Sequence, residues 1–313
     1  MEAPSSPVRA GSLGARAWAA WRHSALHDYL LGVIANSEED DIFFLAGGVG
    51  FSILLAVVPF VLLIVSGLGY FLNLSPAASL SRVSQLLDQL LPPESGPLAN
   101  VVTSLMNEAI RVRGKVGLAS AVTFLWFSTR LFGSLRTVLR IVFDLDHDRG
   151  IIEGKLFDAK VAVVATLGAV AYTIMNAYLA IATTRWQQLF MQAGVRAGAM
   201  SRLTYAGVRT LDVLFVVATF FALYKFLPSR RIGFKTAGLA ALFGGVLLEI
   251  AKVAFSVYLR HFNPGSLFTG TLAAIVIVII WVYYAAIIFI VGGEVGQVYA
   301  LRRVRRLQRA AIE

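Results

Sequence analysis

The chain has 313 residues, of which 58% are hydrophobic and only 15% are charged, and its net charge is +10. Soluble domains contain about 25% charged residues, so this composition excludes an ordinary soluble globular protein and favours an integral membrane protein. The chain contains no cysteine, which excludes a disulfide framework and a thiolate metal site. We interpret the positive charge as a signal of topology and of contact with membrane lipids, with no nucleic-acid partner.

Residues 1–41 are interpreted as a cytoplasmic N-terminal segment. They contain no apolar run followed by a small-residue cleavage site, so no secretory signal peptide is evident. Within them, a helical stripe over residues 13–35 includes Trp18, Trp21 and Tyr29. This stripe predicts an amphipathic helix that lies in the cytoplasmic membrane interface.

Six apolar runs follow, and together they predict an all-α polytopic membrane protein. A helix needs about 20 apolar residues to cross the hydrocarbon core of a bilayer. The predicted spans cover about residues 42–72, 116–140, 161–184, 208–227, 236–259 and 267–291. The second span is weak because it carries Arg130, Arg136 and Arg140 at helical spacing, and the fourth is weak because it includes Asp212. The arginines either extend toward the head groups or face a cavity.

The segment between the first two spans, residues 73–115, predicts a small extracytoplasmic helical insert. Its stretch "SLSRVSQLLDQLLPP" places leucine and valine residues on one face and stops at a Pro-Pro pair. The alternative is a pair of ordinary surface helices packed on the bundle. We therefore divide the chain into the segment 1–41, a six-helix membrane domain over 42–294 and a basic cytoplasmic tail over 295–313.

Topology is predicted from the distribution of lysine and arginine. Of the 28 Lys and Arg residues, 18 lie in segments on one side of the predicted spans, nine lie on the other side, and Lys252 lies within a span. Basic residues favour the cytoplasmic face. The prediction is therefore a multi-pass plasma-membrane protein with both termini in the cytoplasm.

The fifth predicted span contains Glu249 and Lys252, which are three residues apart and so share one face of a helix. A charged group inside the bilayer costs at least about 2.5–3.5 kcal/mol on insertion scales, so the two groups must pair or line a polar interior. One interpretation is an ion pair that fixes helix register, and the other is a polar element of a transport path or proton-coupled site. Glu294, which closes the sixth span, is a further candidate for a buried carboxylate, although a position near the head groups is the alternative.

Glycines and a proline mark the first span. Gly47, Gly48 and Gly50 lie near its start, and Pro59 lies in its middle. Small residues permit close approach of helices, and proline removes one helical hydrogen bond. Close packing is the first interpretation, and a hinge for alternating access is the second.

No motif for catalysis or cofactor binding is found. The stretch "FDLDHDRG" at residues 143–150 lacks the spacing of a calcium loop, and His23 with His27 would need further ligands for zinc. No P-loop, Gly-x-Ser-x-Gly or HExxH pattern occurs. We therefore expect no enzyme activity, no metal and no cofactor.

Three stretches carry a family resemblance: "WFSTRLFGSLRTVLRIVFD", "LEIAKVAFSVYLRHF" and "TGTLAAIVIVIIWVYYAAIIFIVGGEV". They resemble the YihY/BrkB family of bacterial inner-membrane proteins, and the resemblance extends over roughly residues 20–300. It implies a six-span helical fold with cytoplasmic termini in the bacterial plasma membrane. Members have carried a ribonuclease label that is generally regarded as a misassignment, and the chain lacks the clustered carboxylates or paired histidines that RNA cleavage needs.

Two functional hypotheses follow. The first is a transporter or envelope-maintenance factor that handles an anionic or lipid-like substrate, with Glu249 as a switchable carboxylate, Lys252 as its partner, and Arg130 and Arg136 attracting the anion. The second is a structural or scaffolding membrane protein in which the polar pair only fixes packing.

Overall fold

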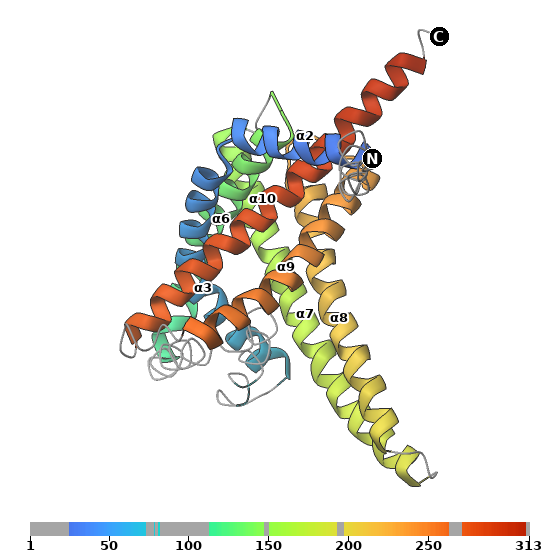
Figure 1. Cartoon of the computed structure of the whole chain (residues 1–313). Coiled ribbons are helices and arrows are strands. Elements are labelled where there is room, and N and C mark those ends of the chain that lie inside the picture. Colours follow the sequence, from blue (N-terminus) through green and yellow to red (C-terminus); the bar gives the residue numbers. More distant parts are fainter. Residues whose placement is uncertain are drawn as a thin grey trace, which may run out of the picture.

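The computed structural model describes residues 25–72, 78, 81, 113–146, 150–192, 197–262 and 271–310, and it defines seven helices and no strand within them (Figure 1). The all-α prediction is confirmed for this part of the chain. The helices are α2 (Ala25–Glu39), α3 (Ile42–Leu72), α6 (Arg113–Val142), α7 (Ile151–Gln192), α8 (Ala197–Phe226), α9 (Phe234–Phe262) and α10 (Thr271–Ala310). The predicted insert falls almost entirely outside the described residues.

Three of these helices contain segments that are long and apolar enough to cross a membrane, namely Ile152–Met175, Phe234–His261 and Ile275–Ala310. A fourth span results if the bent pair His27–Glu39 and Ile42–Val57 is counted as one. Helices α6 and α8 have 30 residues each but do not qualify over their described residues. They correspond to the two spans that the sequence marks as weak, so six spans stay a prediction.

Helix α10 is longer than the span predicted for it. It continues without a break to Ala310, so the predicted boundary between the membrane domain and the basic tail lies inside one helix (Figure 1). The residues beyond this boundary are mostly Ala, Leu, Arg and Gln, which are strong helix formers. The basic segment therefore extends from the end of a membrane helix as a helix with largely exposed side chains.

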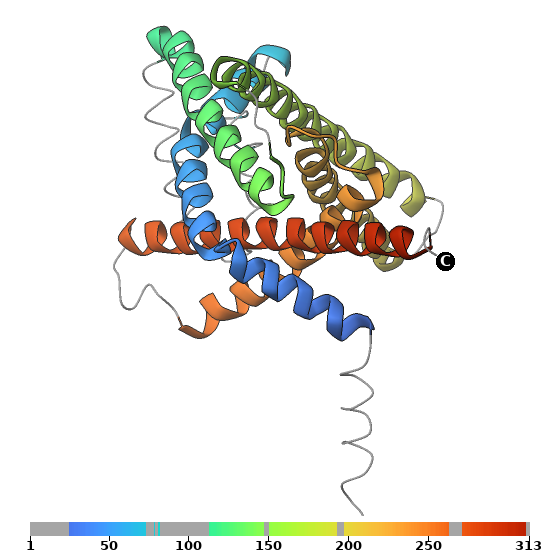
Figure 2. The same cartoon turned by 90° about the horizontal axis from the view of Figure 1, so that it is seen from above.

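Helix α2 crosses α10 near the end where the basic segment begins (Figures 1 and 2). The Tyr29 hydroxyl donates a hydrogen bond to the carbonyl of Val295, and Val33 packs against Val295 and Val298. A Cβ on Gly32 would lie 3.4 Å from Val298, so the two helices are in close contact there. Of the predicted interfacial helix, the part that includes Trp18 and Trp21 lies outside the described residues.

The chain bends by 66° between α2 and α3. Asp41 stands at the bend with a φ of 50°, a left-handed conformation that Asp adopts more readily than most residues. Its carbonyl accepts hydrogen bonds from the amides of Phe44 and Leu45 at 2.9 and 3.1 Å, which begins α3. The bend brings Asp40 beside Glu294 of α10.

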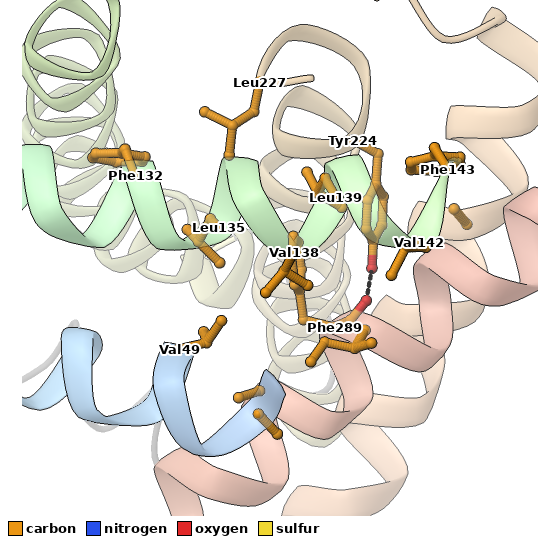
Figure 3. Packing of buried hydrophobic residues seen from close by; sticks show 14 of the residues in the cluster. Val49, Phe132, Leu135, Val138, Leu139, Val142, Phe143, Tyr224, Leu227 and Phe289 are labelled. Carbon is orange, nitrogen blue, oxygen red and sulfur yellow. Dashed lines mark hydrogen bonds between the residues drawn. The ribbon is translucent and has the colours of Figure 1, made fainter. Parts of the chain in front are cut away.

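The main core gathers side chains from α3, α6, α8, α9 and α10 around Tyr224, which is fully buried (Figure 3). The Tyr224 hydroxyl donates a 2.6 Å hydrogen bond to the carbonyl of Phe289, and the two rings stack with centroids 4.9 Å apart. Phe220 adds an edge contact to Phe289 at 5.6 Å. Helices α8 and α10 are therefore joined by ring packing and by a satisfied buried hydroxyl.

Glycines allow α10 to approach this tyrosine closely. A Cβ on Gly292 would lie 2.5 Å from the Tyr224 hydroxyl and 3.2 Å from the carbonyl of Ala240, and a Cβ on Gly296 would lie 3.0 Å from the Ala240 side chain. The Gly-Gly-Glu-Val-Gly stretch therefore packs directly against α8 and α9.

Helices α7 and α8 lie side by side and project away from the other helices at their far ends (Figure 1). The buried Tyr172 hydroxyl donates a 2.6 Å hydrogen bond to Asp212, and its ring stacks on Phe215 at a centroid distance of 3.7 Å. Asp212, which weakened the fourth predicted span, is thus held by a tyrosine of the neighbouring helix.

Candidate functional site

Glu249 and Lys252 form an ion pair on α9, and the two side chains are only 14% and 4% exposed. Lys235 and Arg260 lie near opposite ends of the same helix, which places the pair near its middle. The i, i+3 spacing brings the ammonium and the carboxylate together on one helix face. The structure therefore brings together the two residues that the sequence singled out first.

Arg136 of α6 pairs with Asp158 of α7. Its Nε and Nη2 atoms donate to the two carboxylate oxygens at 3.2 and 3.3 Å, and the side chains are 10% and 2% exposed. Two glycines make room for the pair, since a Cβ on Gly154 would lie 2.7 Å from Arg136 and a Cβ on Gly133 would lie 3.2 Å from Asp158. Sequence reasoning missed Asp158, because its partner is 22 residues away on another helix.

Arg130 lies on α6 with an exposed side chain, apart from the buried Arg136–Asp158 pair. None of the described ion pairs joins it to Glu249 or Lys252. The predicted set of five polar residues is therefore distributed over separate places in the fold, with Arg136 neutralised by Asp158.

Glu294 is fully buried, with an exposed fraction of 0%. Neither of its carboxyl oxygens has a hydrogen-bond partner of good geometry. The groups that act on this carboxyl are the carboxyls of Asp40 and Asp144 and the amide of Asn36. Glu294 is therefore a carboxyl buried inside the protein, as the first interpretation of the sequence has it.

The groups that act on Glu294 are themselves more exposed than Glu294. Asp40 and Asn36 on α2 are half-buried, and Asp144 at the end of α6 is exposed. Burial raises the pKa of Asp40 above its ordinary value; Glu294 opposes this rise, and Asp144 adds to it. Asp144 also accepts a 2.8 Å hydrogen bond from Gln297 of α10.

Asp144 belongs to the stretch "FDLDHDRG", which lacks the spacing of a calcium loop. It has a φ of 48°, and the amide of Leu145 donates to the carbonyl of Arg140 at 2.9 Å. This geometry is a helix C-cap with aspartate in the position usually taken by glycine. The stretch therefore ends α6 and directs one carboxylate toward the α10 surface.

The predicted hinge residues all lie within α3. Gly50 is buried, and a Cβ there would lie 3.8 Å from the backbone of Tyr283 on α10. A Cβ on Gly47 or Gly48 would have no neighbour within 4 Å. Close packing therefore uses Gly50, and Pro59 lies further along the same helix.

Two cavities lie beside these helices. One of about 520 Å³ is lined by α9 and α10, with aromatic side chains that include Tyr258, Trp281 and Tyr284. The other, of about 740 Å³, is lined mostly by apolar side chains of α7 and α8. Leu248 of α9 and the charged Lys160 of α7 complete its lining. Glu249 and Lys252 line neither cavity.

In the described part of the chain, no group of three or more His, Cys, Asp or Glu side chains is arranged to hold a metal ion. His27 lies 3.8 Å from Asp28, and His23 is outside the described residues.

Long apolar helices that contain buried charged pairs define a polytopic α-helical integral membrane protein. The chain belongs to the family described as virulence factor BrkB, which it matches over residues 33–311.

Curated relatives carry the name UPF0761 membrane protein. The chain is 26% identical over 273 residues to the relative from Pseudoalteromonas atlantica, covering 85% of this chain and 83% of the relative. It is 26% identical over 276 residues to the relative from Pelodictyon phaeoclathratiforme, covering 88% of this chain but only 60% of that protein. The relative from Photobacterium profundum is 23% identical over 269 residues, which cover 85% of this chain and 79% of the relative. No solved structure matches the chain.

Proposed function

We propose that this membrane protein is a transporter or envelope-maintenance factor whose substrate is a lipid-like amphiphile with an anionic head group. The observation that supports this proposal best is the apolar cavity of about 740 Å³ between α7 and α8. A cavity of this size and lining suits an acyl chain, because apolar walls give no hydrogen bonds to a polar solute.

The dimensions of the cavity match one leaflet of a bilayer. Its α7 lining extends from Phe157 to Ala169, which corresponds to about 18 Å of helix at a rise of about 1.5 Å per residue. Half of a hydrocarbon core is about 15 Å thick. One extended acyl chain therefore fits along a wall of this length.

Lys160 supplies a charge near one end of this wall. Its side chain is exposed and lines the cavity one helical turn from Phe157. A lysine beside an apolar wall can hold its ammonium at the level of lipid head groups while its methylene groups contact the wall. The cation favours an anionic head group over a zwitterionic one.

Filling the cavity tests the proposal. Gly168 lines it and has open space around it, so Gly168→Trp places an indole in the cavity. Leu167→Trp is the matched control, because Leu167 is 53% exposed and does not line the cavity. We expect Gly168→Trp to lose most of the lipid that copurifies in mild detergent, as quantified by mass spectrometry, and to lose flux of a fluorescent anionic lipid in vesicles. The control should retain both.

Lys160→Gln tests the head-group charge in the same preparation. We expect the anionic share of the bound lipid to fall about fivefold, the factor typical of one basic residue near an anionic surface. Equal lipid content and flux in Gly168→Trp and its control would contradict the proposal.

A structural or scaffolding role is the second candidate. It is favoured by the position of Glu249 and Lys252, which pair with each other and line neither cavity. In that case the pair only fixes the packing of α9.

A further inference from the structure

We propose that Glu294 and Asp40 form a proton-binding site between α10 and the α2–α3 bend, open to water on the side of Asp144. This inference does not depend on the lipid-like substrate, since it concerns a different end of the bundle and a different ligand.

The buried carboxyl groups of the described helices differ in their partners, and Asp212 has the Tyr172 hydroxyl. Glu249 has Lys252, and Asp158 has Arg136. None of the described ion pairs includes Glu294, and the groups that act on it are two carboxyls and an amide. A buried carboxylate without a cation is so costly that the group takes up a proton instead.

Every element around Glu294 contributes to this environment. Helix α2 brings Asn36 and Asp40, with Glu39 beside Asp40, and the end of α6 brings Asp144. Helices α8 and α9 bring Tyr224 and Ala240, which pack against the glycines of the same α10 turn. Among the described groups named here, only the carboxyls from α2 and α6 bear charge, and those charges are negative.

When two carboxyl groups lie close together, the state in which they share one proton is more stable than the state in which both are ionised. When Glu294 is protonated, its hydroxyl can donate a hydrogen bond to the Asp40 carboxylate. Transfer of the proton along this bond to Asp40, and from Asp40 to water, releases it. The exposure of these groups supplies the route, because Glu294 is buried, Asp40 is half-buried and Asp144 is exposed. Burial raises the pKa of Asp40, and the hydrogen bond with Glu294 acts in the opposite direction, as expected when Glu294 is the donor.

Proton release has a mechanical consequence. It leaves Asp40 of α2 and Glu294 of α10 both negative at the junction where Tyr29 donates to Val295. Repulsion between like charges in a medium of low dielectric constant weakens the contact between the two helices. The site therefore links protonation to the docking of α2 on α10.

The test uses the purified full-length protein in detergent without substrate. Infrared spectroscopy at neutral pH detects the C=O stretch of a protonated carboxyl. We expect this band in the wild type, its loss in Glu294→Gln, and its retention in Glu38→Gln, a control on the exposed surface of α2. A band of equal intensity in Glu294→Gln would overturn the proposal.

Stability against pH gives a second readout. Above the ordinary pKa range of a glutamate, the folded protein binds one proton more than the unfolded chain. The unfolding equilibrium constant should therefore rise by up to tenfold for each pH unit. This rise should stop at the pH at which the folded site releases its proton. We expect Glu294→Gln to lose this dependence and Glu38→Gln to keep it. An identical dependence in wild type and Glu294→Gln would overturn the proposal.

Asp40→Asn keeps the test decisive if Glu294→Gln does not fold. Asparagine removes the neighbouring charge and leaves Glu294 in place. The carboxyl band should then disappear at a lower pH than in the wild type, because the repulsion that favours the protonated form is gone. A band that disappears at the same pH in both proteins would show that the two carboxyls do not share a site.

Discussion

The charged pair of Glu249 and Lys252 separates the two functional hypotheses at the scale of single residues. Lys252→Met leaves the Glu249 carboxylate buried without this cation, and the loss of one member of a buried pair costs about 3–5 kcal/mol. The double variant Glu249→Gln, Lys252→Met removes both charges, so we expect most of the melting temperature to return. Thermal unfolding in detergent measures both effects.

The flux of the double variant then decides the role of the pair. If the pair only fixes packing, the folded double variant should carry a fluorescent anionic lipid across reconstituted vesicles at the wild-type rate. A stable double variant without flux would show that the charges act in transport. Lys235→Gln is a matched control, since Lys235 is exposed on the same helix and its substitution removes one charge from the surface.

How much of the candidate site the sequence could predict depends on the distance between partners along the chain. The Glu249–Lys252 pair was predictable because residues three apart share a helix face. Asp158 was missed because only the packing of α6 on α7 brings it to Arg136. The burial of Glu294 was left open because it depends on α2, which lies more than 250 residues earlier and folds over α10.

At the scale of elements, the closest helix contacts depend on glycine. Gly292→Ala would place a methyl group 2.5 Å from the Tyr224 hydroxyl and 3.2 Å from the backbone oxygen of Ala240. Neither neighbour can move freely, since the tyrosine is fully buried and hydrogen-bonded and the other atom is in the main chain of α9. We expect a loss of about 1–3 kcal/mol, as is typical of overpacking, measured as a lower melting temperature.

A second glycine provides the control for this contact. Gly238 lies within α9, and a Cβ there would meet nothing within 4 Å. Gly238→Ala should therefore leave the melting temperature unchanged or raise it, because alanine is the better helix former by up to about 1 kcal/mol. Adding Tyr224→Phe to Gly292→Ala removes the atom closest to the new methyl group and should recover part of the loss. Equal effects of Gly292→Ala and Gly238→Ala would contradict this view of the α9–α10 contact.

The helices themselves were more predictable than their ends. Each predicted span overlaps one helix, because long apolar runs have few alternatives to helix in a bilayer. The ends differ where hydrophobicity stops but helix propensity continues, as in α7 and α10, which extend well into polar sequence. A run of apolar residues predicts the part of a helix that contacts hydrocarbon. The helix itself continues until its backbone is capped, so its ends lie beyond that run.

At the scale of the whole molecule, the bend between α2 and α3, the place where α2 crosses α10 and the basic end of α10 lie on the same side of the bundle, at the top of Figure 1. The charge distribution predicts that this side lies in the cytoplasm, with 18 of the 28 Lys and Arg residues in the segments assigned to it. This orientation would give the proposed proton site access to cytoplasmic water. It remains a prediction that labelling can test directly.

The absence of cysteine makes that test simple, because a single introduced cysteine is unique in the chain. Ser81 is exposed and lies in the predicted extracytoplasmic insert, and Ala310 is exposed at the end of α10. A membrane-impermeant maleimide added to intact cells should label Ser81→Cys at once and Ala310→Cys only after the membrane is permeabilised. Labelling of both in intact cells would place the two positions on the same outer face. That result would reverse the assignment of the basic segment and remove the cytoplasmic route for protons to Glu294.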